Sequence, residues 1–376
     1  MTVGGIGGPV LRIDRDALVS NYHIIRARAA GAKVAGVVKA DAYGVGADIV
    51  VPALISAGCQ QFFVAQFREA MAVQPLLQPD CDIFVLNGLL QGEEDGCAAL
   101  GVIPVLNALH QLDRWAALAQ RLGRELPAAL QCDSGMSRLG LPEDEFATLI
   151  ADPARLKGIS IRLVMSHLAC ADDPGNPANA EQRRLFLERA AHFPDVPRSL
   201  DNSGGSFLPR DHLELVRAGV ALYGGRPSDA GNPMRPILSL HAPITQLRTI
   251  PAGSGVGYGL SHRCTRASVI ATIPMGYADG WPRSLGNRGS AFIAGIRVPI
   301  AGRVSMDSIT LDVTDVPAHL LYPGAPVELI GPHQSVDDVA TDAGTISYEI
   351  FTSLGRRYVR EIQPLAASPM DRSNML

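Results

Sequence analysis

The chain has 376 residues, of which 47% are hydrophobic and 19% are charged, and its formal net charge is −4. This is the composition of a globular protein long enough for two domains. The lack of a basic run excludes the usual electrostatic signature of nucleic-acid binding, and the lack of an apolar stretch of about 18 residues excludes a membrane-spanning helix.

The first residues, MTVGGIGGPVLRID, have neither the basic region nor the apolar region of a signal peptide, so we expect a cytoplasmic protein. The six cysteines are widely spaced and form no CxxC pair. We therefore expect neither a disulfide framework nor a metal site.

Apolar runs of strand length recur through the first part of the chain, and helix-like segments separate most of them. The expected strands are Val34–Val38, Phe62–Ala65, Ile83–Leu86, Ile103–Leu106, Ala128–Leu130, Ile161–Met165, Ser199–Leu200 and Val220–Leu222. The expected helices between them include Ile49–Ala57, Phe67–Leu77, Ala108–Leu122, Glu143–Ile150 and Glu181–His192. Eight β/α units over roughly 200 residues fit a closed (β/α)₈ TIM-type barrel better than an open doubly wound sheet.

Beyond Gly225 the pattern changes to alternating, β-branched stretches broken by proline and glycine. We therefore expect a mostly-β second domain. The predicted domains are residues 1–230, the barrel, and residues 231–376, with residues 1–13 able to pair with the β domain.

Polar side chains follow the apolar runs, at the end where barrel enzymes build their active sites. These residues are Lys39, Gln66, Asn87, Asn107, Asp133, His167, Asp201 with Asn202, and Tyr223. We expect them to converge on one pocket, although helix capping is the better explanation for Asn87 and Asn107.

The segment VAGVVKADAYGVGA, residues 34–47, delivers Lys39 to the end of a buried strand and continues into a glycine-containing loop. Partial desolvation would lower the pKa of this amine towards the range in which it forms a Schiff base. A strand-end lysine that reaches solvent is the alternative, and for a lone lysine it is the better one.

Three further motifs carry groups suited to an anionic ligand. In CDSGMSRLG, Arg138 follows a turn at a strand end, where its planar fork could bind a carboxylate or phenolate. DNSGG, residues 201–205, offers a hydroxyl and successive backbone amides for a phosphate, or is only a turn. In SHLACAD, His167 ends a strand, a position where histidine is often structural.

Ordered segments from Lys39 to Arg357, including those above, resemble the alanine racemases, a pyridoxal-phosphate-dependent family. In the barrel, the resemblance implies that Lys39 carries the cofactor and that Arg217, in VRAGVALYGG, meets its pyridine nitrogen. It also implies that Arg138 contacts the substrate carboxylate and that Asp172 lies towards the mouth of the site. The other implied cofactor-binding residues of the barrel are Tyr43, His167, Asn202, Ser203, Gly219 and Val220.

In the second domain the resembling segments are GVGYGLS, PMGYADGWPR, AGRVSMDSITLDVT and TISYEIFTSLGRR. By resemblance, Tyr258 is the second catalytic base and acts in the active site of the partner subunit of a homodimer. Met306 is a substrate-binding residue, and Tyr348 binds the cofactor phosphate. Tyr277 and Arg303 are placed at the site entrance, in segments that also carry Asp307.

An arginine beside the pyridine nitrogen has a chemical consequence. Because Arg217 cannot accept the ring proton, the nitrogen stays unprotonated and the cofactor is a weaker electron sink. A short-lived carbanion suits reprotonation at the α-carbon and disfavours transamination.

One position departs from the family. Where many alanine racemases have a carbamylated lysine that braces the arginine, this chain has Gln131. A neutral amide cannot neutralise Arg138, so we expect activity that does not depend on added bicarbonate.

The resemblance implies two-base racemisation of L- and D-alanine, in a biosynthetic or a catabolic role. A broad-specificity or serine racemase would share every motif. A decarboxylase is less favoured because it would pair the cofactor nitrogen with a carboxylate, and a non-catalytic pyridoxal-phosphate-binding protein would not need the β domain.

Overall fold

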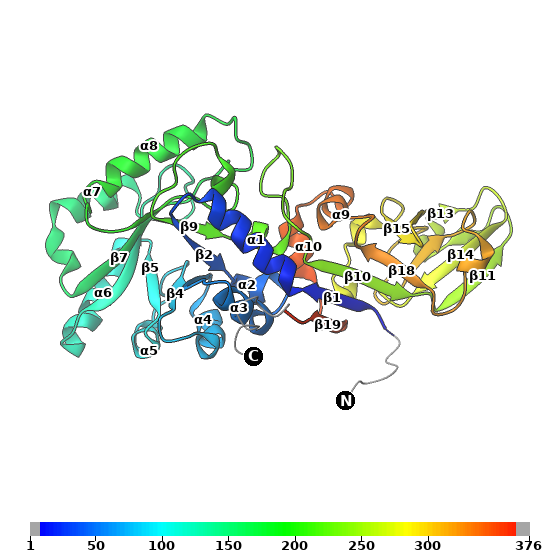
Figure 1. Ribbon diagram of the computed structural model, residues 1–376, viewed down its shortest axis with the longest axis horizontal. Coiled ribbons are helices and arrows are strands. Elements are labelled where there is room, and N and C mark those ends of the chain that lie inside the picture. Colours follow the sequence, from blue (N-terminus) through cyan, green and yellow to red (C-terminus); the bar gives the residue numbers. More distant parts are fainter. Residues whose placement is uncertain (1–7, 366–376) are drawn as a thin grey trace, which may run out of the picture. The chain divides into compact units, whose positions relative to one another are not determined.

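The computed structural model describes residues 8–365, and these residues form two compact units (Figure 1). Residues 18–222 and 226–234 make one unit, and residues 8–17, 223–225 and 235–365 make the other. The expected pairing of residues 1–13 with the β domain falls partly outside the described residues. No helix within residues 8–365 is long and apolar enough to cross a membrane.

The first unit is built on an eight-stranded sheet in the order β8-β7-β6-β5-β4-β3-β2-β9, and every neighbouring pair in it is parallel. Its strands are β2 (Lys33–Val37), β3 (Gln61–Val64), β4 (Asp82–Val85), β5 (Ile103–Leu106), β6 (Leu126–Gln131), β7 (Ile159–Met165), β8 (Arg198–Ser199) and β9 (Leu215–Ala218). Most strand residues are fully buried, as expected for parallel strands that are covered on both faces.

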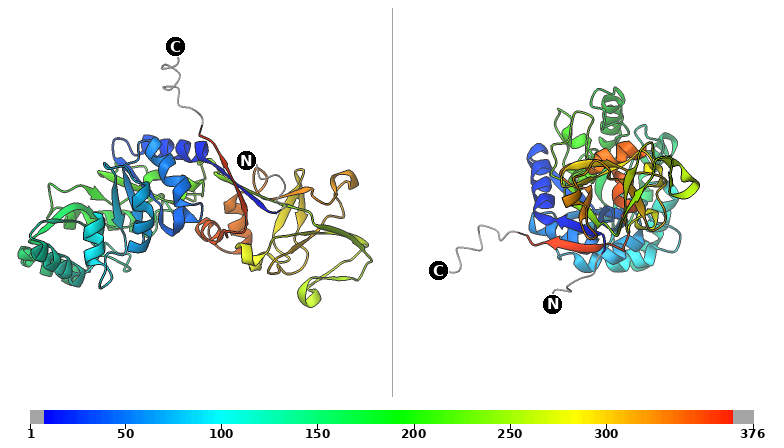
Figure 2. Two further views of the ribbon diagram at one scale, coloured as in Figure 1. Left: turned by 90° about the horizontal axis from the view of Figure 1, so that it is seen from below. Right: turned by 90° about the vertical axis from the view of Figure 1, so that its right-hand side faces the viewer.

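Helices connect these strands and cover the outer side of the sheet, as Figure 1 and Figure 2 show. They are α1 (Arg15–Arg28), α3 (Ala47–Ser56), α4 (Phe67–Val73), α5 (Glu94–Leu100), α6 (Leu109–Leu122), α7 (Glu143–Ala151) and α8 (Ala178–Ala190). A short segment labelled α2 (Lys39–Tyr43) follows β2 and has an unusual backbone, described below.

Two hydrogen bonds close the seam between the end strands β8 and β9. The backbone N–H of Arg217 donates to Asp201 O (2.9 Å), and Ser199 Oγ donates to Leu215 O (2.7 Å). The seam is joined, so the predicted TIM-type barrel is confirmed.

The position predicted for the eighth strand is wrong. The strand is Leu215–Ala218, whereas Val220–Tyr223 forms a short 3₁₀ turn, so Tyr223 does not follow a strand end. The reason is Arg217, which lies inside the strand and is buried. A charged residue breaks the apolar pattern, so the apparent run begins after it.

The second unit is mostly β, as predicted. Its larger sheet has the order β16-β15-β18-β10-β1-β19 and its smaller sheet the order β11-β14-β17. The larger sheet contains β1 (Val10–Asp14), β10 (Leu238–Pro243), β15 (Ser290–Ile293), β16 (Ile296–Pro299), β18 (Pro326–Ile330) and β19 (Val359–Gln363). The remaining elements are β11 (Gln246–Ile250), β12 (Gly255–Val256), β13 (His262–Arg263), β14 (Ser268–Ile273), β17 (Ile309–Asp312), α9 (Val336–Ala343) and α10 (Ser347–Ser353).

A close backbone approach at Gly280 predicts a large effect on stability. Gly280 has φ 90°, and a Cβ at this residue would lie 1.7 Å from Ser353 O. Gly280→Ala should lower the free energy of unfolding by at least about 2 kcal/mol more than Gly324→Ala does. Gly324 is the matched control because its φ is 93° and nothing lies within 4 Å of its added Cβ. Urea unfolding followed by circular dichroism measures both, and equal losses would contradict the steric argument.

Candidate active site

Lys39 begins a left-handed turn directly after β2. Ala40, Asp41, Ala42 and Tyr43 have φ between 51° and 55°, a region that costs an L-residue about 1–2 kcal/mol at each position. Two backbone hydrogen bonds lie within the turn, because Ala42 N–H donates to Val38 O (2.9 Å) and Gly44 N–H donates to Ala40 O (2.8 Å). The strained turn therefore determines the position from which the Lys39 side chain projects at the end of β2.

The pKa of the Lys39 amine is lowered from its ordinary value. Burial of the side chain is the main cause, and the positive charges of Arg138 and Arg217 add to it, while the Glu69 carboxylate opposes them. A larger share of the amine is therefore unprotonated at neutral pH, as a Schiff-base lysine requires.

Arg217 lies in β9 with 3% of its surface exposed. Its guanidinium donates to Ser199 Oγ (2.6 Å) and to Ser166 O (2.6 Å). Burial lowers its pKa to about 10, and the Asp201 carboxylate opposes this shift, so the group is still a cation at neutral pH. The result is a fixed positive charge at the carboxyl end of the barrel.

His167 follows β7 and lies beside this cation, with Nδ1 3.3 Å from Arg217 Nη2. Its Nε2 is 3.3 Å from Asn202 Nδ2. Burial and the nearby charges of Arg217, Arg138 and Lys39 lower the pKa of His167 to about 3. The imidazole is therefore neutral under ordinary conditions and acts here by shape and hydrogen bonding.

Ser203, Gly219 and Tyr43 form a compact polar group beyond β9. Ser203 Oγ accepts the N–H of Gly219 (2.8 Å), which leaves the hydroxyl hydrogen available to a ligand. A Cβ at Gly219 would lie 2.4 Å from Tyr43 Oη, so the phenol occupies the space that a side chain would fill. The hydroxyls of Ser203 and Tyr43, beside the backbone amide of Val220, are donors that suit a phosphate, whereas the Gly219 amide is already bonded to Ser203. Together with the Lys39 amine and the Arg217 cation, this donor set fits pyridoxal phosphate.

The loop after β6 carries Arg138. Asp133 Oδ1 accepts the N–H groups of Gly135 (3.0 Å), Met136 (3.0 Å) and Ser137 (3.1 Å), which folds the loop into a tight turn. Arg138 itself is exposed. Gln131 is buried and its Nε2 donates to Leu139 O (3.1 Å), so its amide bonds the loop backbone.

In the second unit, Tyr258 stands in a turn between Gly257 (φ 71°) and Gly259 (φ 70°) and is 71% exposed. A Cβ at Gly259 would lie 3.3 Å from Arg303 Nη1, so the guanidinium packs against this turn. The phenol is thus presented outwards by a backbone that only glycine adopts readily at both flanks.

Tyr277 and Met306 belong to two loops of the second unit that pair through their backbones. Tyr277 N–H donates to Ser305 O (3.0 Å), and Ala278 N–H donates to Met306 O (3.0 Å). Arg357 ties these loops together, because it pairs with both carboxylate oxygens of Asp279 (2.7 and 2.8 Å) and with Asp307 (2.7 Å).

Two other predicted residues are exposed. Asp172 follows β7 in the loop before α8 and accepts the N–H of Asp229 on its backbone oxygen (2.8 Å). Tyr348 lies in the first turn of α10 and is 40% exposed.

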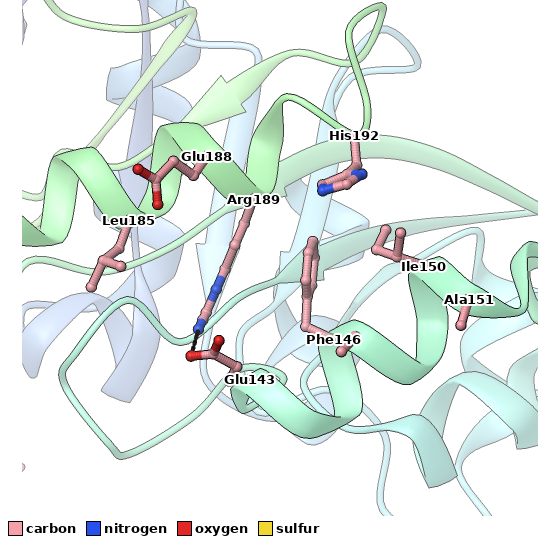
Figure 3. A pocket seen from close by; sticks show the side chains of 9 residues that line it. Glu143, Phe146, Ile150, Ala151, Leu185, Glu188, Arg189 and His192 are labelled. Carbon is pink, nitrogen blue, oxygen red and sulfur yellow. Dashed lines mark ion pairs between the residues drawn. The ribbon is translucent and has the colours of Figure 1, made fainter.

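A cavity of about 460 Å³ lies between α7 and α8 on the outside of the barrel. Figure 3 shows side chains that line it. Phe146 and His192 form an edge-to-face pair there, and Arg189 lies near Glu143 (3.5 Å). None of the predicted site residues lines this cavity.

Two charged residues were missed by the sequence analysis. Glu69 accepts the N–H of Ala40 (2.7 Å), next to Lys39, and closes a capping box with Gln66 at the start of α4. Glutamine is not among the residues that mark an N-cap in a sequence, so the spacing of Gln66 and Glu69 gave no signal. Asp279 is a buried carboxylate paired with Arg357, and these residues are too far apart in the chain for their spacing to indicate it.

The family models that match the chain are "Alanine racemase, N-terminal domain" over residues 13–227 and "Alanine racemase, C-terminal domain" over residues 237–362. A catabolic alanine racemase of Agrobacterium fabrum is 52% identical over 364 residues, covering 96% of this chain and 94% of its own. An alanine racemase of Rhodospirillum rubrum is 51% identical, covering 93% of this chain and 95% of its own. The crystal structure of the Bartonella henselae alanine racemase with covalently bound pyridoxal phosphate superposes with a TM-score of 0.91 at 41% identity, covering 95% of this chain and all of its own (100%).

Proposed function

The chain belongs to the alanine racemase family, and from this membership we propose that it interconverts L-alanine and D-alanine by two-base transfer of the α-proton. Pyridoxal phosphate, on which the family depends, supplies an electron sink for the carbanion that proton removal leaves at the α-carbon. The observation that carries the proposal is the Lys39 amine of lowered pKa beside the buried cation of Arg217.

Lys39 holds the cofactor covalently through Nζ and serves as one of the two bases. The same Nζ would take the α-proton of D-alanine or return a proton to form it. Its lowered pKa supports both tasks, because an unprotonated amine is needed for attachment and for proton removal.

Tyr258 is the proposed second base and acts on the opposite face of the α-carbon, where its Oη removes the proton of L-alanine. Its high exposure supports a role in the partner subunit of a homodimer.

The remaining site residues are proposed to bind and orient the cofactor and the substrate. Arg217 would meet the pyridine nitrogen as a cation that cannot accept a proton, which favours reprotonation over transamination. His167 would contact the cofactor as a neutral imidazole. Tyr43, Asn202, Ser203, Gly219 and Val220 bind the phosphate end, joined by Tyr348. Arg138 and Met306 contact the substrate, and Asp172, Tyr277 and Arg303 line the entrance.

The test is to incubate the protein and pyridoxal phosphate with L-alanine in D₂O and to follow chirality and α-deuteration together. Racemisation with α-deuterium incorporated is expected. Parallel reactions with L-serine, L-lysine and L-arginine address a broad-specificity or serine racemase, which predicts comparable turnover of those substrates. Binding of the cofactor without any exchange would contradict the proposal.

Because position 131 is a glutamine, we expect racemisation to be independent of added bicarbonate. A glutamine has no amine that CO₂ could carbamylate, so rates in degassed buffer and in buffer with added bicarbonate should agree within about twofold. Gln131→Lys is the informative control because it restores an amine at this position. A clear bicarbonate requirement of the unaltered chain would contradict this prediction.

A further inference from the structure

The left-handed turn after β2 needs support from outside itself. Four consecutive residues, Ala40 to Tyr43, have positive φ, and none of them is glycine. At about 1–2 kcal/mol for each position, such a turn persists only where neighbouring groups hold it. The first amide of the turn, the N–H of Ala40, points away from the turn and towards α4.

Glu69 provides an acceptor for that amide. Its Oε1 accepts Ala40 N–H (2.7 Å), while its Oε2 accepts Ala65 N–H (2.7 Å) and Gln66 N–H (3.1 Å). One carboxylate therefore links the loop after β2 to the loop after β3. Hydrogen bonds to an ionised carboxylate are about twice as strong as neutral ones, so this link is suited to hold a strained segment.

Glu69 is also the one acidic group among the charges that act on Lys39 within residues 8–365. Arg138 faces the amine from the loop after β6, Arg217 faces it from β9, and His167 lies near it after β7 as a neutral ring. Burial and both arginines lower the pKa of Lys39, and Glu69 from α4 opposes them.

We propose that Glu69 is a positioning residue for Lys39: its carboxylate ties the Lys39–Ala40 peptide to the loop after β3 and so fixes where the amine leaves the turn. The inference deepens the proposed function and rests on the role given there to Lys39. Glu69 acts through the backbone and through its charge, and it does not touch the reacting atoms.

The experiment titrates Lys39 in the full-length chain freed of pyridoxal phosphate, using trace acetylation by acetic anhydride across a pH series and mass spectrometry of the Lys39 peptide. Holoenzyme racemisation is measured beside it. In Glu69→Gln the acetylation midpoint should move to lower pH, because the opposing negative charge is gone. Racemisation should fall by at least about tenfold, because the turn loses one of its anchors.

The variant Glu69→Asp distinguishes the effect of the negative charge from the effect of side-chain length. The aspartate keeps the negative charge, so its acetylation midpoint should lie near that of the unaltered chain, whereas its shorter side chain cannot reach both loops and racemisation should still fall. If Glu69→Gln does not fold, Glu69→Asp decides alone: unimpaired racemisation contradicts the proposal and slowed racemisation with an unmoved midpoint supports it.

Asp338→Asn is the matched control for helix capping. Asp338 closes the capping box of α9 by accepting Ser335 N–H (2.9 Å), the same task that Glu69 performs for Gln66 at α4. Asp338→Asn should change neither the acetylation midpoint of Lys39 nor the rate of racemisation. An unmoved midpoint in Glu69→Gln, or racemisation within about twofold of the unaltered chain, would overturn the proposal. Because acetylation needs no turnover, an inactive unaltered chain would contradict the proposed function separately.

Discussion

Lys39→Ala should lose racemisation of alanine by more than about 10⁴-fold. Removing the amine takes away both the covalent attachment of the cofactor and one of the two bases, and a positioned base alone contributes about 10²–10⁴ in rate. The rate is measured by the appearance of D-alanine from L-alanine. Borohydride reduction of the holoenzyme followed by peptide mass spectrometry shows which lysine carries the cofactor.

Lys33→Ala is the matched control, since Lys33 is an exposed lysine at the start of the same strand. It should keep both activity and the reduced cofactor on Lys39. Turnover in Lys39→Ala, or cofactor fixed to Lys33 or Lys157 in the unaltered chain, would remove Lys39 from the proposed mechanism.

Tyr258→Phe should lower racemisation by about 10²–10⁴-fold while the protein still binds pyridoxal phosphate through Lys39. The two enantiomers should also respond differently in D₂O. D-alanine should still exchange its α-hydrogen without inversion, because Lys39 remains, whereas L-alanine should exchange far more slowly. Mass spectrometry of each enantiomer after chiral separation measures this.

The control for Tyr258→Phe is Tyr322→Phe, which removes the hydroxyl of another exposed tyrosine of the same unit (53% exposed). Its exchange should match that of the unaltered chain for both enantiomers. Equal exchange of L- and D-alanine by Tyr258→Phe would show that the phenol is not the base for L-alanine.

The barrel could be predicted because its strands are buried on both faces and therefore appear as short apolar runs. Ile103–Leu106 was predicted to the residue, and it is buried throughout. The eighth strand was misplaced for the converse reason, since Arg217 is a charge buried inside β9 and satisfied by groups from other strands. Hydropathy records only that a residue is charged, and the compensating partners lie up to 51 residues away.

The neighbourhood of Lys39 and His167 follows from the same principle, because parallel strands present their carboxyl ends on one side. In the barrel unit burial and the charge of Arg217 lower the pKa of Lys39, and burial and the charges of Arg217 and Lys39 lower the pKa of His167. The left-handed turn could not be predicted, because Ala, Asp, Ala and Tyr carry no glycine signal for positive φ. Glu69 was missed for the same reason, because one of its partners is the Ala40 amide, which belongs to this turn.

The order of strands in the second unit bears on how the chain folds as the ribosome makes it. β1 lies between β10, which begins at Leu238, and β19, which begins at Val359. All barrel strands have been made once Ala218 is complete, whereas β1 has to wait for partners that are synthesised much later. The barrel is thus an insertion in the other unit, and a nascent or truncated chain that lacks β19 leaves one edge of β1 uncovered, ready to pair with another chain.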